Sequence, residues 1–389
     1  MYIKECYNKH QSEEASGLRK EKKLNHQKQK LGTKATLQKY AKRYFIDAMG
    51  AMANGLFATL LIGTIIKTLG QQMANLIAAT WAQDFGGILV KVGDFACAAD
   101  GCAMAMAIGY ALKAHPLVLF SLAGVGYATD VLGGAGGPLA VLIVGIVASE
   151  MGMLVSKKTK VDVIVTPLVT VLVGCGLALL IAEPIGNGAK ALGGIITWAT
   201  AQQPFLMGIV ISVVVGMILT LPISSAAICA GLLLSGLAGG AAVAGCCAQM
   251  VGFAVISFKE NRWGGLIAQG LGTSMLQVPN IVKHPRIWIA PTLASAITGP
   301  IATTVFKLQM NGAPVSAGMG TCGMVGPIGV ISGWFDPVAE GAVAVTPNAL
   351  DWLGLLMICI ILPAALSMVF DRILRKIGWV KDGDMKLSV

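Results

Sequence analysis

Apolar runs long enough to cross a bilayer recur along the chain and constrain its fold more than any other feature. Spanning the hydrocarbon core takes about 20 mostly apolar residues per helix, and runs of this kind recur between Phe45 and Phe370. We count about eight to ten of them as candidate transmembrane helices. Only 12% of the 389 residues are charged, against about a quarter in an ordinary soluble domain. The sequence therefore predicts an all-α polytopic membrane protein.

Several apolar runs are interrupted by Gly, Pro and Ser. Such interruptions occur at 116–137, 219–242 and 317–333, and residues 273–299 combine Gln, Asn, Lys, His, Arg and three prolines in one segment. Irregular backbone at membrane depth is tolerated only where protein or a water-filled cavity covers it. In transporters, broken helices of this kind supply polar groups to the substrate. We therefore expect re-entrant hairpins that line a solute pathway.

The two ends of the chain carry much of its positive charge. Residues 1–44 hold 12 of the 29 Lys and Arg residues. We interpret them as a basic cytoplasmic tail with an interfacial helix at 34–44, in contact with anionic lipid headgroups. The tail lacks interleaved aromatics, so we expect no nucleic-acid partner. Residues 45–374 form the predicted membrane domain, and 375–389 form a second cytoplasmic tail.

Motifs of catalysis are missing from the sequence. There is no Walker sequence, nucleophile elbow or HExxH pair, and the nine cysteines form no CxxC pair. We expect the thiols, including the neighbours Cys246 and Cys247, to pack as small hydrophobic groups. The sequence thus predicts no catalytic residue, metal site or cofactor, and favours a protein that moves or senses a solute.

Uncharged polar side chains at the interruptions are the candidate binding groups. They are Thr273, Ser274, Gln277 and Asn280 around Pro279, Ser224 and Ser225 after Pro222, and Thr321 in the Gly-rich passage. Amides and hydroxyls offer donors and acceptors that match the hydroxyls of a solute. Each group also has a structural alternative, because such side chains equally satisfy helix ends or bond preceding carbonyls.

Asp100 is the strongest acidic candidate. It lies between Ala99 and Gly101 in an apolar stretch, and an ionisable group at membrane depth is a functional candidate by default. Its carboxyl group could bind a pair of solute hydroxyls or a coupling proton.

The order of segments resembles enzyme IIC, the membrane component of bacterial phosphoenolpyruvate-dependent sugar phosphotransferase systems. Residues 134–174, GAGGPLAVLIVGIVASEMGMLVSKKTKVDVIVTPLVTVLVG, are similar to a span, basic loop and proline-led span of the fructose and mannitol type. Residues 204–227, PFLMGIVISVVVGMILTLPISSAA, are similar to a span that runs into a polar passage. The chain looks closest to a stand-alone branch without fused phosphoryl-carrier domains.

This resemblance implies a homodimeric permease of the bacterial cell membrane. Such a protein binds a sugar near mid-membrane, and separate enzyme IIA and IIB proteins carry out the phosphoryl transfer. The fructose-type segment has a Glu four residues before its proline, whereas this chain has Met275 before Pro279. Two alternatives remain: a membrane sensor that keeps the binding fold without transport, and an ion-coupled carrier that uses Asp100.

Overall fold

The computed structural model describes residues 40, 42–76, 80–339 and 342–387. Contacts divide the chain into two units, Met1–Ile46 and Asp47–Val389. In the described part of the first unit, Tyr40 and Tyr44 stack with ring centroids 6.0 Å apart. The interfacial helix predicted for 34–44 lies mostly outside the described residues.

The second unit is helical. Its first half contains α2 (Met49–Leu56), α3 (Ile62–Leu76), α4 (Thr80–Ala98), α5 (Asp100–Ala111), α6 (Pro116–Gly133), α7 (Gly137–Val155) and α8 (Asp162–Thr200). Its second half contains α9 (Pro204–Thr220), α10 (Ser225–Gly231), α11 (Gly236–Ile256), α12 (Phe258–Ile267), α13 (Val278–Lys283), α14 (Ile289–Pro300), α15 (Val325–Phe335), α16 (Ala349–Leu356) and α17 (Leu362–Lys376). Short π-helical and 3₁₀ turns join several of them.

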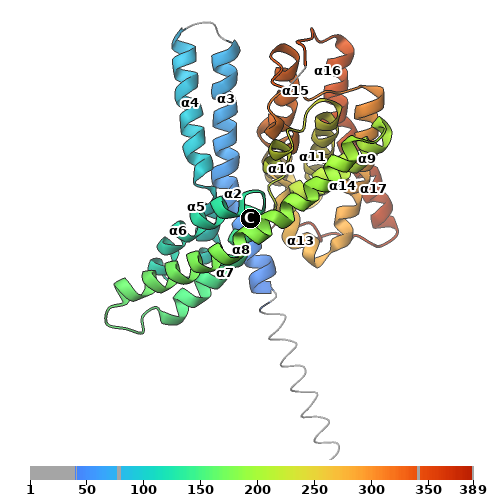
Figure 1. Cartoon of the computed structure of the whole chain (residues 1–389). Helices are drawn as coiled ribbons and strands as arrows, with labels where there is room; N and C mark the ends of the chain where they lie inside the picture. Colours follow the sequence, from blue (N-terminus) through green and yellow to red (C-terminus); the bar gives the residue numbers. More distant parts are fainter. Residues whose placement is uncertain (1–39, 41, 77–79, 340–341, 388–389) are drawn as a thin grey trace, which may run out of the picture. The chain divides into compact units, whose positions relative to one another are not determined.

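Helices α3 and α4 form a long pair (Figure 1). Glycines allow their backbones to approach closely, since a Cβ added at Gly70 would lie 2.6 Å from the carbonyl oxygen of Gly86. Small residues at such contacts let helices pack tightly in lipid. Lys67 and Asp94 join the two helices by an ion pair of 2.6 Å.

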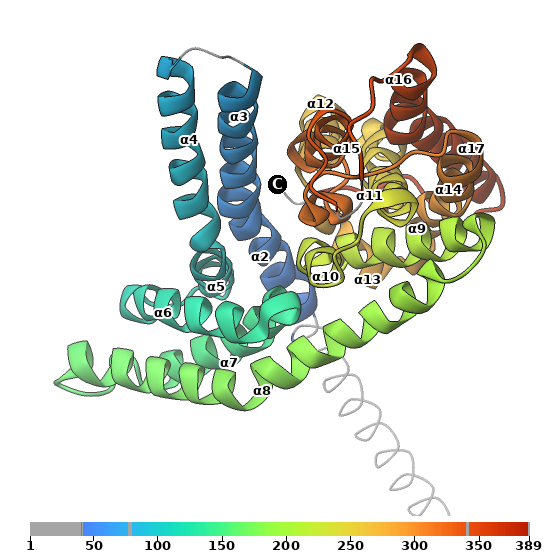
Figure 2. The same ribbon diagram turned by 45° about the horizontal axis from the view of Figure 1, so that its top comes forward.

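Helix α8 is one helix of 39 residues through Pro167 and Pro184, shown in green in Figure 2. Residues 163–182 and 189–203 therefore belong to one continuous element. Proline removes one backbone donor, yet membrane helices tolerate it where neighbouring groups satisfy the freed carbonyl. The interruption expected at 116–137 is confined to a 3₁₀ turn, Gly134–Gly136, between α6 and α7.

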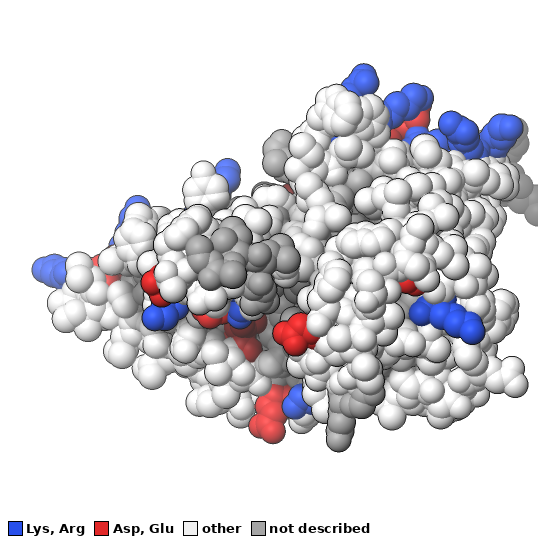
Figure 3. All heavy atoms as spheres, turned by 90° about the horizontal axis from the view of Figure 1, so that it is seen from above, with Lys and Arg blue, Asp and Glu red and all other residues white. Residues whose placement is uncertain are grey.

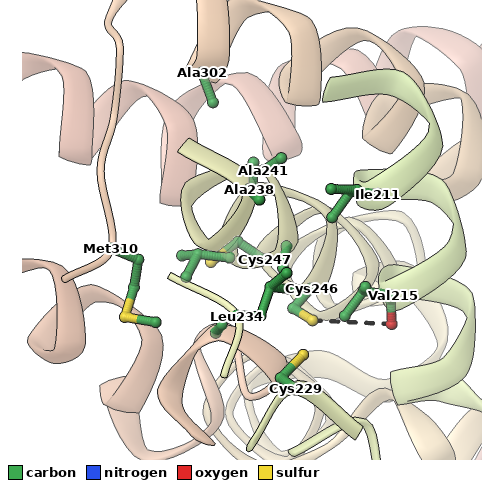
Figure 4. Close-up of a cluster of buried hydrophobic side chains, with 14 of the residues drawn as sticks. Ile211, Val215, Cys229, Leu234, Ala238, Ala241, Cys246, Cys247, Ala302 and Met310 are labelled. Carbon is green, nitrogen blue, oxygen red and sulfur yellow. Dashed lines mark hydrogen bonds between the residues drawn. The ribbon is translucent and has the colours of Figure 1, made fainter. Parts of the chain in front are cut away.

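Helix α11 is the centre of the second half. It packs on α9, α14 and α17, and nearly every one of its side chains is buried. Figure 4 shows its apolar surroundings, in which Cys246 and Cys247 lie beside Ile211, Val215 and Met310. Both thiols are fully buried, so they pack as hydrophobic groups, as the sequence predicted.

The described residues contain five helical stretches that are long and apolar enough to cross a membrane. They are Ile46–Ala74, Pro116–Val155, Asp162–Thr200, Gly236–Ile256 and Ala349–Lys376, and shorter apolar helices occur at Pro204–Thr220 and Cys322–Phe335. Uncharged side chains cover most of the face shown in Figure 3. The predicted all-α polytopic fold is confirmed, while the exact number of crossings stays a prediction.

Replacing Gly245 with Ala is expected to destabilise the bundle. A Cβ at this position would overlap the backbone carbonyl of Ser212 on α9, and overpacking of a close contact costs about 1–3 kcal/mol. The melting temperature of the detergent-solubilised protein should therefore fall. Gly176→Ala on α8 is the matched control, because nothing lies within 4 Å of its added Cβ. Equal melting temperatures for the two variants would contradict the close α9–α11 contact.

Candidate functional site

Three interrupted passages pack against or near α11 in the structure. Residues 221–224 join α9 to α10, residues 268–277 join α12 to α13, and residues 313–324 precede α15. The 3₁₀ turn Pro314–Gly318 packs on both α10 and α11, and the π-helical turn Ala268–Gly272 packs on α11 and on Cys322–Met324. Tertiary packing therefore brings together segments that are far apart in the sequence.

The two predicted serines have different roles. The hydroxyl of Ser224 accepts a hydrogen bond from the backbone N–H of Ala227 at 3.2 Å and so caps α10. The buried hydroxyl of Ser225 donates to the carbonyl oxygen of Gly318 at 2.6 Å. Ser225, the first residue of α10, thus joins this helix to the third passage.

Thr321 lies in a tight turn of the third passage. Gly320 has a φ of +52°, and a Cβ there would lie 2.7 Å from the backbone of Cys246, so only glycine fits. The Thr321 side chain is 2% exposed, and among the described residues its hydroxyl has no hydrogen-bond partner. A buried polar atom without a partner is costly, which makes Thr321 a candidate for contact with a polar ligand.

Gln249 organises a buried polar network in the middle of α11. Its Oε1 accepts hydrogen bonds from Trp288 Nε1 at 3.0 Å and from Thr220 Oγ1 at 3.3 Å. Its Nε2 donates to Thr292 Oγ1 at 3.3 Å. The hydroxyl groups of Thr220 and Ser274 are 2.9 Å apart, so the network extends to the second passage.

A second network consists of three amide side chains. Gln277 Nε2 donates to Gln269 Oε1 at 2.8 Å, and Gln277 Oε1 accepts from Asn280 Nδ2 at 2.8 Å. Gln269 Nε2 in turn donates to the hydroxyl of Ser257 at 2.8 Å. We call Gln269, Gln277 and Asn280 the amide site. All three are buried, and the remaining donors of Gln277 and Asn280 bond backbone carbonyls of Met385 and Lys386 at 3.0 Å.

Thr273 and Met275 shape the start of this segment. The hydroxyl of Thr273 accepts a hydrogen bond from the backbone N–H of Met275 at 3.1 Å, which begins the 3₁₀ turn Ser274–Gln277. The Met275 side chain is buried. An apolar side chain therefore fills the position at which the fructose-type segment has a carboxylate.

Asp100 lies apart from the other candidates. It begins α5, which packs on α2, α6 and α7. Its Oδ1 accepts a hydrogen bond from the backbone N–H of Gly101 at 2.7 Å, and its carboxyl neighbour is Asp130 on α6. The structure thus gathers the uncharged candidates around α11 and leaves Asp100 in the first half of the bundle.

Six members of these networks were missed at the level of sequence: Thr220, Gln249, Ser257, Gln269, Trp288 and Thr292. Gln249 had a detectable signal, because it is the one amide in the 21-residue apolar helix α11 and polar side chains within such helices hydrogen-bond to neighbouring helices. Trp288 had none, since its partner Gln249 lies 39 positions away. Gln269 had none either, because its partners Ser257 and Gln277 lie on other elements.

A helical bundle with apolar spans and buried, uncharged polar networks at broken helices defines an integral membrane protein of the solute-transport class. The family model described as "Phosphotransferase system, EIIC" matches residues 46–387. The chain therefore belongs to this family and is a membrane permease component of the phosphotransferase system. No curated protein matches the chain.

Replacing Gln249 with Ala should destabilise the protein, because it removes the acceptor of the Trp288 indole N–H. An unsatisfied buried polar group costs about 1–3 kcal/mol, and the melting temperature in detergent should fall accordingly. Gln203→Ala is the matched control, because Gln203 is exposed and its side chain does not cap α9. A Gln249 variant as stable as the Gln203 variant would contradict the network.

Proposed function

We propose that this enzyme IIC component binds a sugar or sugar alcohol at the interrupted segments around α11, with the amide site as its main contact. The observation that carries the proposal is the concentration of buried, uncharged donors and acceptors at Gln269, Gln277 and Asn280. Each amide both donates and accepts, which matches hydroxyl groups that do the same.

The hydroxyl groups near the amide site extend the proposed contact surface. Ser274 and Thr273 belong to the same segment, Ser225 begins α10, and Thr321 lies in the third passage, which packs on α10 and α11. The hydroxyl of Thr321, which has no partner within the described part of the chain, supports this extension, since a solute hydroxyl would satisfy it. The half-buried indole of Trp288 adds an aromatic surface of the kind on which apolar faces of ligands pack.

The fructose and mannitol type is the proposed subtype, on the basis of the segment order in 134–174 and 204–227. With Met275 buried in place of a carboxylate, the segment holds the sugar through neutral groups. We propose that separate enzyme IIA and IIB proteins supply the phosphoryl group. We also propose that the protein is a homodimer, that both of its ends are cytoplasmic, and that the basic tail contacts anionic lipid.

Vesicles reconstituted with this chain and supplied with enzyme IIB in its phosphorylated form should accumulate labelled D-mannitol or D-fructose as the sugar phosphate. In Gln277→Ala the loss of one hydrogen-bonding group, worth about 1–3 kcal/mol, should reduce uptake at low sugar concentration about 5- to 150-fold. Liquid-scintillation counting of the separated phosphate measures this.

Gln309→Ala is the control, since Gln309 is exposed and lies outside both networks. Normal uptake by the Gln277 variant would exclude the amide site. Sugar binding without any flux would favour the sensor alternative instead.

A further inference from the structure

The segment after α17 packs back onto the amide site. Residues 377–387 leave α17 and bring Val380 and Met385 into an apolar cluster with Phe253, Ile256, Ile281, Ile287, Ala290 and Leu374. Met385 is fully buried and Val380 is 2% exposed. The sequence predicted residues 375–389 as a cytoplasmic tail, and in the structure residues up to 387 are part of the packed body. We call residues 377–387 the tail segment.

Side chains of α12 hold the main chain of the tail segment. The Glu260 carboxylate accepts hydrogen bonds from the backbone N–H groups of Gly383 at 3.0 Å and Met385 at 2.9 Å. The Asn261 amide donates to the Met385 carbonyl and accepts from the Leu387 N–H, both at 2.9 Å. These contacts engage the backbone of the tail segment, and the buried side chain of Met385 anchors the same residues in the apolar cluster.

The amide site completes this set of contacts. The Met385 carbonyl accepts from Gln277 Nε2 as well as from Asn261, so both of its lone pairs are used. The Lys386 carbonyl accepts from Asn280 Nδ2. The proposed sugar-binding donors are therefore engaged by the chain itself.

Charged groups hold the base of the tail segment. Arg375 pairs with Asp371 at 2.6 Å, Asp382 at 2.6 Å and Glu260 at 3.6 Å. The Arg286 guanidinium lies 5.3 Å from the centre of the Trp379 ring, and His284 Nδ1 lies 3.7 Å from Asp384. These charged contacts can hold the start of the tail segment in place while the residues around Met385 leave the amide site.

We propose that the tail segment is a displaceable occupant of the amide site, and that solute hydroxyls replace the Met385 and Lys386 carbonyls when the sugar binds. The inference rests on the proposed function. Its physical basis is that buried Gln277 and Asn280 donors need an acceptor in either state. Carbonyl and hydroxyl oxygens are equivalent acceptors for an amide N–H, so the two occupants compete.

The test is hydrogen exchange with mass spectrometry on the full-length protein in detergent, combined with binding of labelled D-mannitol and D-fructose. Saturating sugar should speed amide exchange in residues 377–387 of the wild-type chain. Met385→Asp places a charge in the apolar cluster and should free the tail. If the tail occupies the site nine-tenths of the time, this variant should bind sugar about tenfold more tightly.

Gln309→Asp is the matched control, because it introduces the same charge at an exposed side chain outside both networks and outside the tail segment. Its exchange and affinity should equal those of the wild-type protein. Sugar that binds without changing tail exchange, or equal affinity in Met385→Asp and wild type, would overturn the proposal.

Failure of the proposed function gives a different result. If neither sugar binds the wild-type protein or Met385→Asp, the proposed sugar type is wrong. Amide exchange of the protein without sugar then decides whether the tail segment can leave the amide site. Amide exchange that is much faster in residues 383–387 than in α11 supports a displaceable tail. Protection as deep as that of α11 overturns it, and this readout does not depend on Met385→Asp folding.

Discussion

The need to satisfy every backbone polar group away from water is the constraint on which this structure depends. In hydrocarbon an unpaired N–H or C=O costs several kcal/mol, so each interruption of a helix must find its partners inside the protein. The chain meets this need by tertiary pairing: Gly236 and Met310 exchange two backbone hydrogen bonds at 3.0 Å, and Ser225 bonds Gly318. The passages consequently pack against one another around α11.

The same constraint explains why the buried polar groups are mostly neutral. Charges are costly to bury without partners, and the charged groups near the amide site form the Arg375 cluster at its edge. Neutral amides and hydroxyls can change partners at small cost, since one hydrogen bond replaces another of similar strength. This is the property that a site for sugar hydroxyls requires, and an internal segment can use the same donors.

Periodicity and composition predicted the helical class and the apolar spans. They did not show that Asp162–Thr200 forms one helix through Pro167 and Pro184, which packs on α6 and α7. They also left the roles of the polar candidates open. Ser224 and Ser225 are adjacent, yet one caps its own helix and the other bonds a residue 93 positions away. Local patterns cannot distinguish these outcomes, because the deciding partner is remote.

The sequence alone determined the environment of the protein. Long apolar runs can be buried only in lipid or against each other, whatever the tertiary arrangement. Only the folded structure showed which polar groups meet. Gln249 joins Trp288 and Thr220, Gln277 joins Gln269 and the tail segment, and Asp100 remains in the other half of the bundle. Hydrogen bonds act over about 3 Å, so a shared site exists only after packing has brought distant segments within that distance.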